Sequence, residues 1–235
     1  MLDLSEAFRA ALRQISLLDP QLIEIVGLSL KVTLTAVAIA TIIGFALGGA
    51  LTVYRFPGRG ALAAVLNALM GLPPVVAGLF VYLFLSNAGP LGVLQLLYTP
   101  LAMIIAQVIL ITPIIAALTR QTCEDLLEEY REQLRSLGAS SAAIVTTLVW
   151  DGRYRLVTAV RAGFGRAIAE VGAVMIVGGN IDHVTRTMTT AIALETSKGN
   201  IALALALGMI LLAIALAINM ALMGIRRIAS HFAYA

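Results

Sequence analysis

The chain has 235 residues, of which 60% are hydrophobic and only 12% charged, and its formal net charge is +3. A soluble domain carries about 25% charged residues, so this composition indicates a membrane protein rather than a soluble one. The basic residues are scattered, which argues against a nucleic-acid partner, and the single cysteine, Cys123, excludes an internal disulfide and a cysteine-rich metal centre.

Residues 1–23 form the first predicted element, an amphipathic helix. Its apolar side chains recur on one helical face, at Leu4, Phe8, Ala11, Leu12, Ile15 and Leu18. Its charged side chains fall on the opposite face, at Asp3, Glu6, Arg9 and Arg13. This pattern is typical of a helix that lies in the membrane interface, and a helix docked on the rest of the protein explains it equally well.

Five apolar stretches follow, each long enough to cross a hydrocarbon core that requires roughly 20 helical residues. They cover residues 25–53, 61–85, 100–119, 156–178 and 201–223. The sequence therefore predicts an all-α, polytopic membrane protein with about five transmembrane helices, whose two termini lie on opposite sides of the membrane.

The distribution of Lys and Arg predicts the orientation of these helices, because short cytoplasmic loops are enriched in both residues. The basic residues gather in three regions, namely Arg55 and Arg59, then Arg120, Arg131, Arg135, Arg153 and Arg155, and finally Arg226 and Arg227. We expect these regions to face the cytoplasm. The protein would then be a multi-pass cell-membrane protein with its N-terminus outside and its C-terminus in the cytoplasm.

A charged segment interrupts the hydrophobic chain between the third and fourth predicted spans. From Glu124 to Gly138, apolar residues recur at helical spacing between charged ones. This predicts a short cytoplasmic surface helix that ends at Gly138, since glycine accepts the left-handed conformation of a helix terminus, followed by a second short helix. The segment is either a rigid element that transmits force or an ordinary cytoplasmic loop.

Part of this segment, "EQLRSLG" (132–138), resembles the EAA loop of ABC importer permeases, although Gln133 and Leu134 replace the two alanines of that motif. Two further stretches, "GLPPVVAGL" (71–79) and "GFGRAIAEVGAVMIVGGN" (163–180), resemble motifs of the permeases for molybdate, tungstate and sulfate. The stretch "TRTMTTAIALETSKGN" (185–200) is most similar to the tungstate members.

The resemblance implies a type I ABC importer permease fold and a homodimer that works with two cytoplasmic ATPase subunits and an extracytoplasmic oxyanion-binding protein. The permease domain would cover residues 24–227, with a coupling loop at 120–155 and a C-terminal tail at 228–235. The residues implied in coupling to the ATPase are Glu132, Leu134, Arg135, Leu137, Gly138, Ala139 and Ser140.

The implied activity is ATP-driven import of a tetrahedral oxyanion, with tungstate preferred and molybdate or sulfate as alternatives. The chain has no Gly-x-x-x-x-Gly-Lys-Ser/Thr phosphate loop, so ATP and Mg²⁺ would bind the partner subunit, and we expect no cofactor, metal or catalytic residue here. A stand-alone channel or a membrane scaffold is the alternative from another class; the charged segment would then be an idle loop.

Several residues are candidates for the translocation path or its gate, namely Pro73, Pro74, Thr112, Pro113, Arg166, Glu170, Asn180 and Thr187. The prolines should kink the second and third spans. Arg166 and Glu170 are four residues apart and should pair on one helical face, either beside the pore or as a helix anchor. The threonine hydroxyls at 185, 187, 189 and 190 either donate to the anion or cap a helix.

Three more expectations concern packing and the outer surface. The small residues Gly44 and Gly48, and likewise Ala204 and Gly208, should lie where helices pack closely. We expect Lys31 to extend to the outer interface toward Glu24. His183 and His231 fall in terminal or loop regions and should be solvated.

Overall fold

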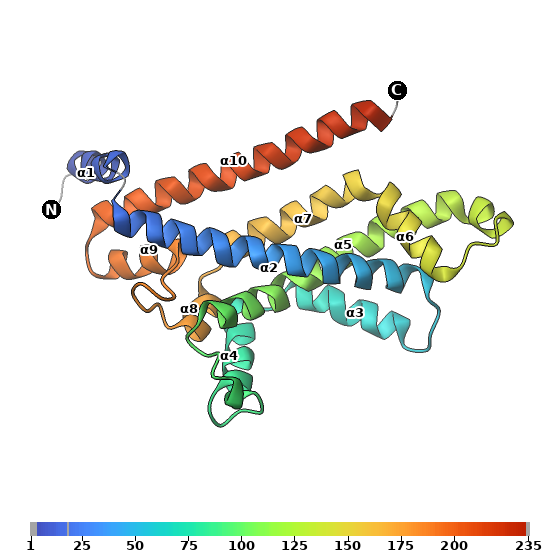
Figure 1. Ribbon diagram of the computed structural model, residues 1–235, viewed down its shortest axis with the longest axis horizontal. Coiled ribbons are helices and arrows are strands. Elements are labelled where there is room, and N and C mark those ends of the chain that lie inside the picture. The colour runs from blue at the N-terminus through green and yellow to red at the C-terminus, as the bar shows by residue number, and fades with distance from the viewer. Residues whose placement is uncertain (1–3, 18, 234–235) are drawn as a thin grey trace. The chain divides into compact units, whose positions relative to one another are not determined.

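The computed structural model describes residues 4–17 and 19–233, and all regular secondary structure within these residues is helical (Figure 1). The elements in chain order are α1 (Leu4–Ser16), α2 (Pro20–Val53), α3 (Arg59–Met70), α4 (Pro74–Leu85), the 3-10 turn η1 (Gly92–Leu94), α5 (Pro100–Ser136), α6 (Ser141–Asp151), α7 (Arg153–Ile168), α8 (Gly172–Gly178), α9 (Met188–Ser197) and α10 (Ile201–Ala233). Asp3, Leu18, the side chain of Leu4 and the side chains of residues 225–235, with Arg226, Arg227 and His231 among them, lie outside the described part.

The fold consists of two compact units, and the long helices α2, α5 and α10 contribute residues to both. The first unit contains the described parts of residues 1–35, 73–107 and 168–218. The second contains residues 36–72 and 108–167, together with the last part of α10 from residue 219. Each unit has its own buried apolar cluster.

In the first unit, the N-terminal part of α2 packs with α9 and with the N-terminal half of α10. The buried cluster consists of Leu22, Ile25, Met188, Ala191, Leu203 and Leu207. The Ser29 hydroxyl lies at its edge, where it donates to the carbonyl of Ile25 and accepts from the backbone N–H of Met188, both at 2.7 Å. This hydroxyl satisfies the first N–H of α9 inside an apolar environment, where an unpaired donor would be costly.

In the second unit, α2 lies backbone to backbone against α5. A methyl group on Gly48 would lie 2.5 Å from the carbonyl oxygen of Ala116, and one on Gly44 would lie 2.7 Å from the side chain of Ile115. The prediction that Gly44 and Gly48 mark a close helix contact is confirmed. At Gly208 the prediction is wrong, because no atom of the described residues lies within 4 Å of its Cβ position.

The helices differ from the five continuous spans that the sequence predicts. Three are long and apolar enough to cross a membrane, namely α2, α5 and residues 201–224 of α10, or four if α3 and α4 together count as one broken span. The second predicted span, residues 61–85, is bent by 109° between α3 and α4. The fourth, residues 156–178, is divided into α7 and α8, neither of which is long enough to span alone.

The kink predicted at Pro73 and Pro74 is confirmed by the bend between α3 and α4, whereas Pro113 does not interrupt its helix. Pro73 is the N-cap of α4 and Pro74 is its first residue, a position where the missing N–H costs nothing. Pro113, in contrast, lies inside α5, which runs without interruption from Pro100 to Ser136. The charged segment from Glu124 is therefore the end of a long helix and no separate short one, because the residues between Thr119 and Leu127 include no glycine or proline that would end it.

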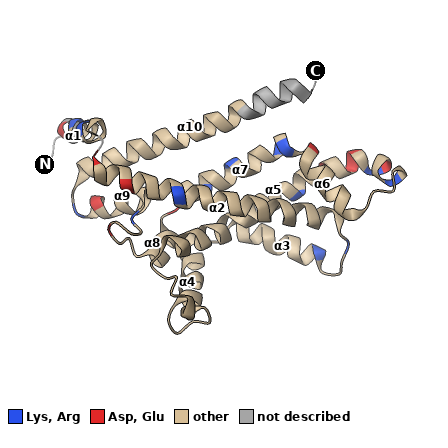
Figure 2. Ribbon diagram, viewed as in Figure 1, with Lys and Arg blue, Asp and Glu red and all other residues tan. Residues whose placement is uncertain are grey.

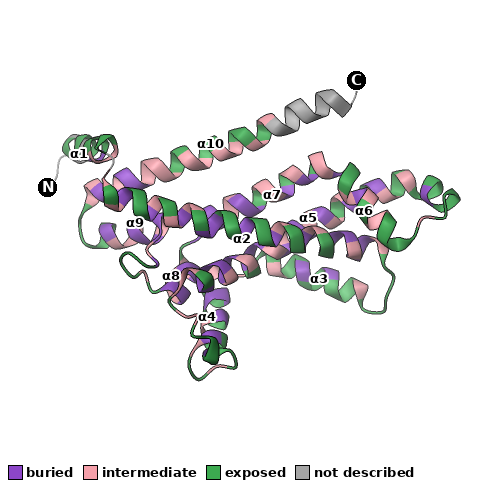
Figure 3. Ribbon diagram, in the orientation of Figure 1, coloured by how far each residue is buried: buried purple, intermediate pink, exposed green. Residues whose placement is uncertain are grey.

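Charge and exposure divide the helix surfaces sharply. Figure 2 shows acidic and basic residues together on the C-terminal part of α5, whereas the middle of α2 carries none. Figure 3 shows exposed positions recurring along α10, where Leu212 is 72% exposed and Leu216 and Met220 follow at the helical spacing of four. Such an apolar stripe on a membrane helix faces lipid or another protein surface.

The close contact at Gly48 leads to a stability prediction. Gly48→Ala places a methyl group against the backbone of α5, which cannot rotate away as a side chain can, so overpacking should destabilise the protein by about 1–3 kcal/mol. We expect the apparent melting temperature in detergent to fall by several degrees. Gly208→Ala, at a helix position with free space, is the control and should not lower it, because alanine favours a helix over glycine by about 0.5–1 kcal/mol. An unaltered melting temperature for Gly48→Ala would contradict the close approach.

Candidate functional site

The connection between α5 and α6 is a tight helix–turn–helix built around Gly138. This residue has φ +63°, a left-handed conformation that glycine adopts without steric cost. The backbone N–H groups of Gly138 and Ala139 donate to the carbonyls of Arg135 and Leu134, each at 3.1 Å. The Ser140 hydroxyl then caps α6 by accepting from the N–H of Ala143 at 3.3 Å. The predicted stop at Gly138 and the second helix after it are confirmed.

This helix–turn–helix is held as one body by an apolar contact between its arms. Cys123 and Leu126 of α5 form a buried cluster with Leu148 of α6. Gly152, at the end of α6, allows this contact, since a Cβ there would lie 3.1 Å from Leu126. The two arms therefore move together, and α6 is fixed to a helix that continues into the apolar part of the chain.

The tip of the turn exposes apolar surface. Leu137 is 73% exposed, although it lies among charged residues, and Trp150 at the other end of α6 is also exposed. These exposed apolar side chains stand on a charged, ordered element, where they are available for contact with another surface. Glu132 and Ser140 are exposed on the same turn.

An ion-pair cluster ties the start of α3 to α5. Glu124 Oε1 lies 3.2 Å from Arg59 Nη2 and 3.3 Å from Arg120 Nε. All three side chains are roughly one third exposed. Each pair then contributes at most about 1 kcal/mol to stability, so the cluster positions the α2–α3 connection more than it holds the fold together.

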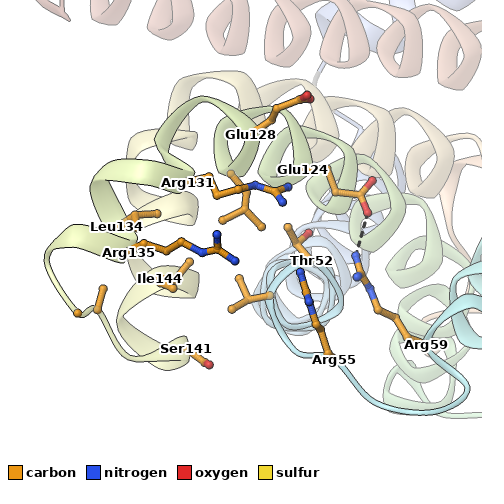
Figure 4. Close-up of a pocket in the computed structure, with 14 residues that line it drawn as sticks. Thr52, Arg55, Arg59, Glu124, Glu128, Arg131, Leu134, Arg135, Ser141 and Ile144 are labelled. Atoms are coloured by element: carbon orange, nitrogen blue, oxygen red, sulfur yellow. Dashed lines mark hydrogen bonds and ion pairs between the residues drawn. The ribbon is translucent and has the colours of Figure 1, made fainter.

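A pocket of about 660 Å³ opens between the end of α2, the last turns of α5 and the start of α6 (Figure 4). It is lined by Thr52, Val53, Arg55, Arg59, Glu124, Leu127, Glu128, Arg131, Leu134, Arg135, Gly138, Ala139, Ser141 and Ile144. Of the residues predicted to couple to the ATPase, four line this pocket: Leu134, Arg135, Gly138 and Ala139. Leu137 at the tip and the exposed Glu132 and Ser140 do not.

The arginines at 55, 59 and 131 enter this site without having been predicted as functional residues. In the sequence they indicate only which loops face the cytoplasm. Arg55 and Arg59 lie four residues apart after α2, whereas Arg131 lies more than 70 residues further along in α5, and no spacing rule relates the two segments. Only the packing of α2 against α5 brings them to one pocket.

Arg153 fixes the corner between α6 and α7, another feature that the sequence analysis missed. Its guanidinium lies 4.7 Å from the centre of the Trp150 ring and 4.4 Å from that of Tyr154, and Nη1 donates to the carbonyl of Trp150 at 2.6 Å. Guanidinium groups stack favourably on aromatic faces. The spacing Trp-x-x-Arg-Tyr at a helix end is the signal that could have indicated it.

The candidate path residues at the α7–α8 junction adopt an arrangement other than the predicted one. α7 ends at Ile168, so Glu170 lies between two helices, and the prediction that it shares a helical face with Arg166 is wrong. The buried Glu170 carboxylate accepts from the backbone N–H of Ala173 at 2.9 Å in the first turn of α8. The carboxylate thus binds the backbone of the next helix, a local bond that competes with continuation of α7.

The threonine hydroxyls bond within the chain. Thr187 and Thr190 form a reciprocal capping box at the start of α9, and the Thr189 hydroxyl donates to the carbonyl of Glu170 at 2.7 Å. Thr185 accepts from the N–H of Ile181 at 2.9 Å. Asn180 has φ +51° and donates to the carbonyl of Thr190 at 3.4 Å. These bonds are the ones expected of a cap and loop, and a role of Asn180 or Thr187 in transport stays a prediction.

The candidates Thr112 and Pro113 lie next to each other in α5. Thr112 precedes Pro113 in α5, and its buried hydroxyl oxygen has no hydrogen-bond partner among the described residues. Pro113 removes the donor for the carbonyl of Ile109, one turn earlier. Arg161 of α7 donates to the side chain of Asn219 in α10 at 3.4 Å.

On the first unit, a charged cluster joins the start of α2 to the loop before α9. The Nδ1 atom of His183 lies 2.7 Å from Glu24 Oε2, and Asp182 pairs with Arg186 at 2.6 Å. The hydrogen bond to Glu24 is the main reason that the pKa of His183 is raised above its usual value. The expectation that His183 is solvated is confirmed, since its side chain is 69% exposed. Glu24, expected to attract Lys31, contacts His183 instead.

The long apolar helices define a multi-pass membrane protein, from which an ordered, charged helix–turn–helix projects. No protein-family model matches the chain. It is 42% identical over 203 residues to the probable anion ABC transporter permease protein of Haloferax volcanii, covering 84% of this chain and 88% of that protein. It is 41% identical over 216 residues to the tungstate uptake system permease protein TupB of Peptoclostridium acidaminophilum, covering 92% and 95%.

A more distant relative is the sulfate transport system permease protein CysT of Salmonella typhimurium, with 31% identity over 173 residues, covering 69% of this chain and 62% of that protein. The chain belongs to the ABC transporter permeases of the oxyanion branch, with tungstate permeases among its near relatives. The resemblance predicted from the motifs is confirmed, and this family is one of transport components rather than enzymes.

The Glu24–His183 contact leads to a prediction on pH. Because the folded protein raises the pKa of His183, the contact stabilises it fully below the usual histidine pKa, about 6.5, and this contribution is lost as pH rises through the raised value. Glu24→Gln should therefore lower the apparent melting temperature at pH 5.5 and leave it unchanged at pH 9. A difference of the same size at both values would contradict this. Lys31→Gln is the control and should change neither.

Proposed function

We propose that this protein is the permease subunit of an ATP-driven ABC importer that moves a tetrahedral oxyanion, preferably tungstate, into the cytoplasm. The observation that carries the proposal is the ordered α5–α6 helix–turn–helix, which projects an exposed Leu137 from a chain whose near relatives are named as anion and tungstate permeases. We place the N-terminus outside and the C-terminus in the cytoplasm, following the positive-inside rule. This orientation requires the broken segments α3–α4 and α7–α8 to carry the chain back across the membrane, in addition to the long helices α2, α5 and α10.

Coupling to the ATPase rests on the mechanical continuity of α5. The same helix contains the apolar stretch that begins at Pro100 and the charged end that stops at Ser136. Because α6 packs on α5 through Cys123, Leu126 and Leu148, a displacement of the turn is transmitted along α5 without bending a loop. Glu132, Leu137 and Ser140 form the contact surface for the ATPase, and ATP and Mg²⁺ bind that partner.

The working assembly is a homodimer with two cytoplasmic ATPase subunits and an extracytoplasmic binding protein. Three or four spans are few to enclose a gated path, and a two-fold symmetric pair closes it. α4 offers an apolar surface for this purpose, at Val75, Leu79, Phe80, Leu83 and Phe84, all of which are exposed. An exposed apolar surface of this kind packs equally well against a second copy of the chain or against lipid, because both are apolar.

The path itself needs polar groups that bind an oxyanion weakly enough to release it. The candidates are Thr112 at the proline of α5, the break at Pro73 and Pro74, and the α7–α8 junction with Arg166 and Glu170. Asn180 and Thr187 follow in the loop before α9. Neutral hydroxyl and N–H donors suit this task, because a fixed countercharge would hold a dianion too tightly.

The preference for tungstate rests on the tungstate permease at 41% identity, beside an anion permease at 42%. The sulfate alternative rests on a more distant relative at 31% identity. Molybdate has the same shape and charge as tungstate. The binding protein supplies most of the selectivity, so the permease alone discriminates poorly among these anions.

Coupling is tested by straining the turn. Gly138→Val introduces a β-branched residue at φ +63° and should reduce both co-purification with the ATPase subunit and oxyanion uptake by at least about tenfold. Gly199→Val is a matched control, since Gly199 has φ +80°, equally free surroundings and a place between α9 and α10. Association and uptake unaffected by Gly138→Val would show that the turn is an idle loop.

Cargo is tested by reconstituting the chain in liposomes with the ATPase and binding protein encoded beside it. We expect ATP-dependent accumulation of tungstate that sulfate at a hundredfold excess does not suppress. Suppression by equimolar molybdate would assign both anions to the system. Uptake of sulfate in preference to tungstate would overturn the tungstate assignment while leaving the permease assignment intact.

A further inference from the structure

The pocket between α2, α5 and α6 concentrates positive charge. Four of its lining side chains are arginines, at positions 55, 59, 131 and 135. Figure 4 shows the guanidinium groups of Arg131 and Arg135 directed across the pocket toward Arg55 and Thr52. These arginines come from the α2–α3 connection, the first residue of α3 and the C-terminal part of α5, so the pocket is assembled by tertiary packing within the second unit.

The acidic residues of the pocket do not neutralise this charge. Glu124 and Glu128 are its two carboxylates, so four arginines and two glutamates leave a formal charge of +2. Glu124 is already shared by Arg59 and Arg120, at 3.2 and 3.3 Å. Figure 4 shows the Glu128 carboxylate pointing away from the guanidinium groups. Within the described residues, no carboxylate lies within salt-bridge distance of Arg55, Arg131 or Arg135.

The remaining lining suits an anion as well. Gly138, Ala139 and Ser141 line the pocket at the start of α6, where the N-terminal end of an eleven-residue helix carries partial positive charge. Val53, Leu127 and Ile144 form an apolar floor that lowers the local dielectric and strengthens charge–charge interactions. Guanidinium groups bind phosphate-type oxygens through paired N–H donors.

We infer that this pocket binds a tetrahedral, phosphate-like anion between Arg55, Arg131 and Arg135. Two sources supply this chemistry on the cytoplasmic side: a free oxyanion in solution, or the phosphate of an anionic phospholipid beside the end of α2. The cytoplasmic placement rests on the proposed function, whereas the binding itself depends only on the pocket. The anion would join the α2–α3 connection to the coupling turn and restrict how that turn moves.

The test uses the full-length chain without its partners, so it is independent of coupling. In one arm, phosphate or tungstate is titrated into the detergent-solubilised protein at constant ionic strength, against chloride, and the melting temperature and calorimetric heat are recorded. In the other arm, the protein is placed in phosphatidylcholine bilayers with or without phosphatidylglycerol, and the retained lipid is identified by native mass spectrometry. Saturable binding in the first arm assigns a free oxyanion, and selective retention of phosphatidylglycerol assigns a lipid.

Two variants and a matched control locate the site. Arg55→Gln and Arg135→Gln should each weaken the binding by about tenfold, because each removes charge-assisted hydrogen bonds to the anion. Arg155→Gln removes the same charge from an exposed position on α7 outside the pocket and should leave binding within about twofold, the level of a screened surface charge. Melting temperatures of all three without ligand verify folding.

Three results would overturn the inference. The first is an absence of binding in both arms, and the second is an equal loss in Arg155→Gln, which indicates general charge attraction. The third is cross-linking of Arg135 to an acidic segment of the ATPase with no anion binding, which makes the pocket part of the subunit interface. None of these results bears on the Gly138→Val comparison, so the coupling proposal and the anion site fail separately.

Discussion

The close contact between α2 and α5 at Gly44 and Gly48 is the constraint on which the second unit depends. Because neither glycine has a side chain, the backbone of α2 approaches α5 closely. At Gly48 it lies next to the carbonyl oxygen of Ala116, the Cβ atom of Thr119 and the backbone nitrogen of Arg120. The Thr52 hydroxyl continues this contact by donating to the carbonyls of Gly48 and Arg120, at 3.0 and 3.3 Å. A larger residue at Gly48 would separate the end of α2 from α5 and dismantle the pocket that the two helices enclose with α6.

Charged residues in this protein serve two different purposes. Some are fully paired within the chain and order a connection, as Glu195 does: its carboxylate accepts from Lys198 and Asn200, both at 2.9 Å, and the bond from Lys198 keeps its pKa below the usual range. Others have no carboxylate within salt-bridge distance among the described residues, as is true of Arg55, Arg131 and Arg135 in the pocket. In a chain with so few charges, that second group is the informative one, because clustered like charge creates a field that attracts an oppositely charged ligand or partner.

Local sequence signals predict the parts of the fold that depend on neighbouring residues. The turn at Gly138, the bend at Pro73 and Pro74 and the close packing at Gly48 each follow from the backbone chemistry of one or two residues. The division of the fourth predicted span at Glu170 does not, since hydropathy continues through it and only the carboxylate bond to Ala173 reveals the break. Likewise, helical spacing places Arg166 and Glu170 on one helical face only if the helix continues, and α7 ends at Ile168. The basic pocket depends on contacts between segments some 80 residues apart, from Arg55 to Arg135, which no local pattern encodes.

The length of α5 has a mechanical consequence. At a rise of about 1.5 Å per residue, its 37 residues extend roughly 55 Å, nearly twice the thickness of a hydrocarbon core of about 30 Å. A helix of this kind acts as a lever whose outer arm is about 25 Å long. Tilting it by about 5° at the membrane surface displaces the far end by roughly 2 Å, a distance comparable to the helix shifts that switch other proteins between states. In the proposed coupling, small angular changes among the apolar helices and larger translations at Leu137 would be two aspects of one rotation of α5.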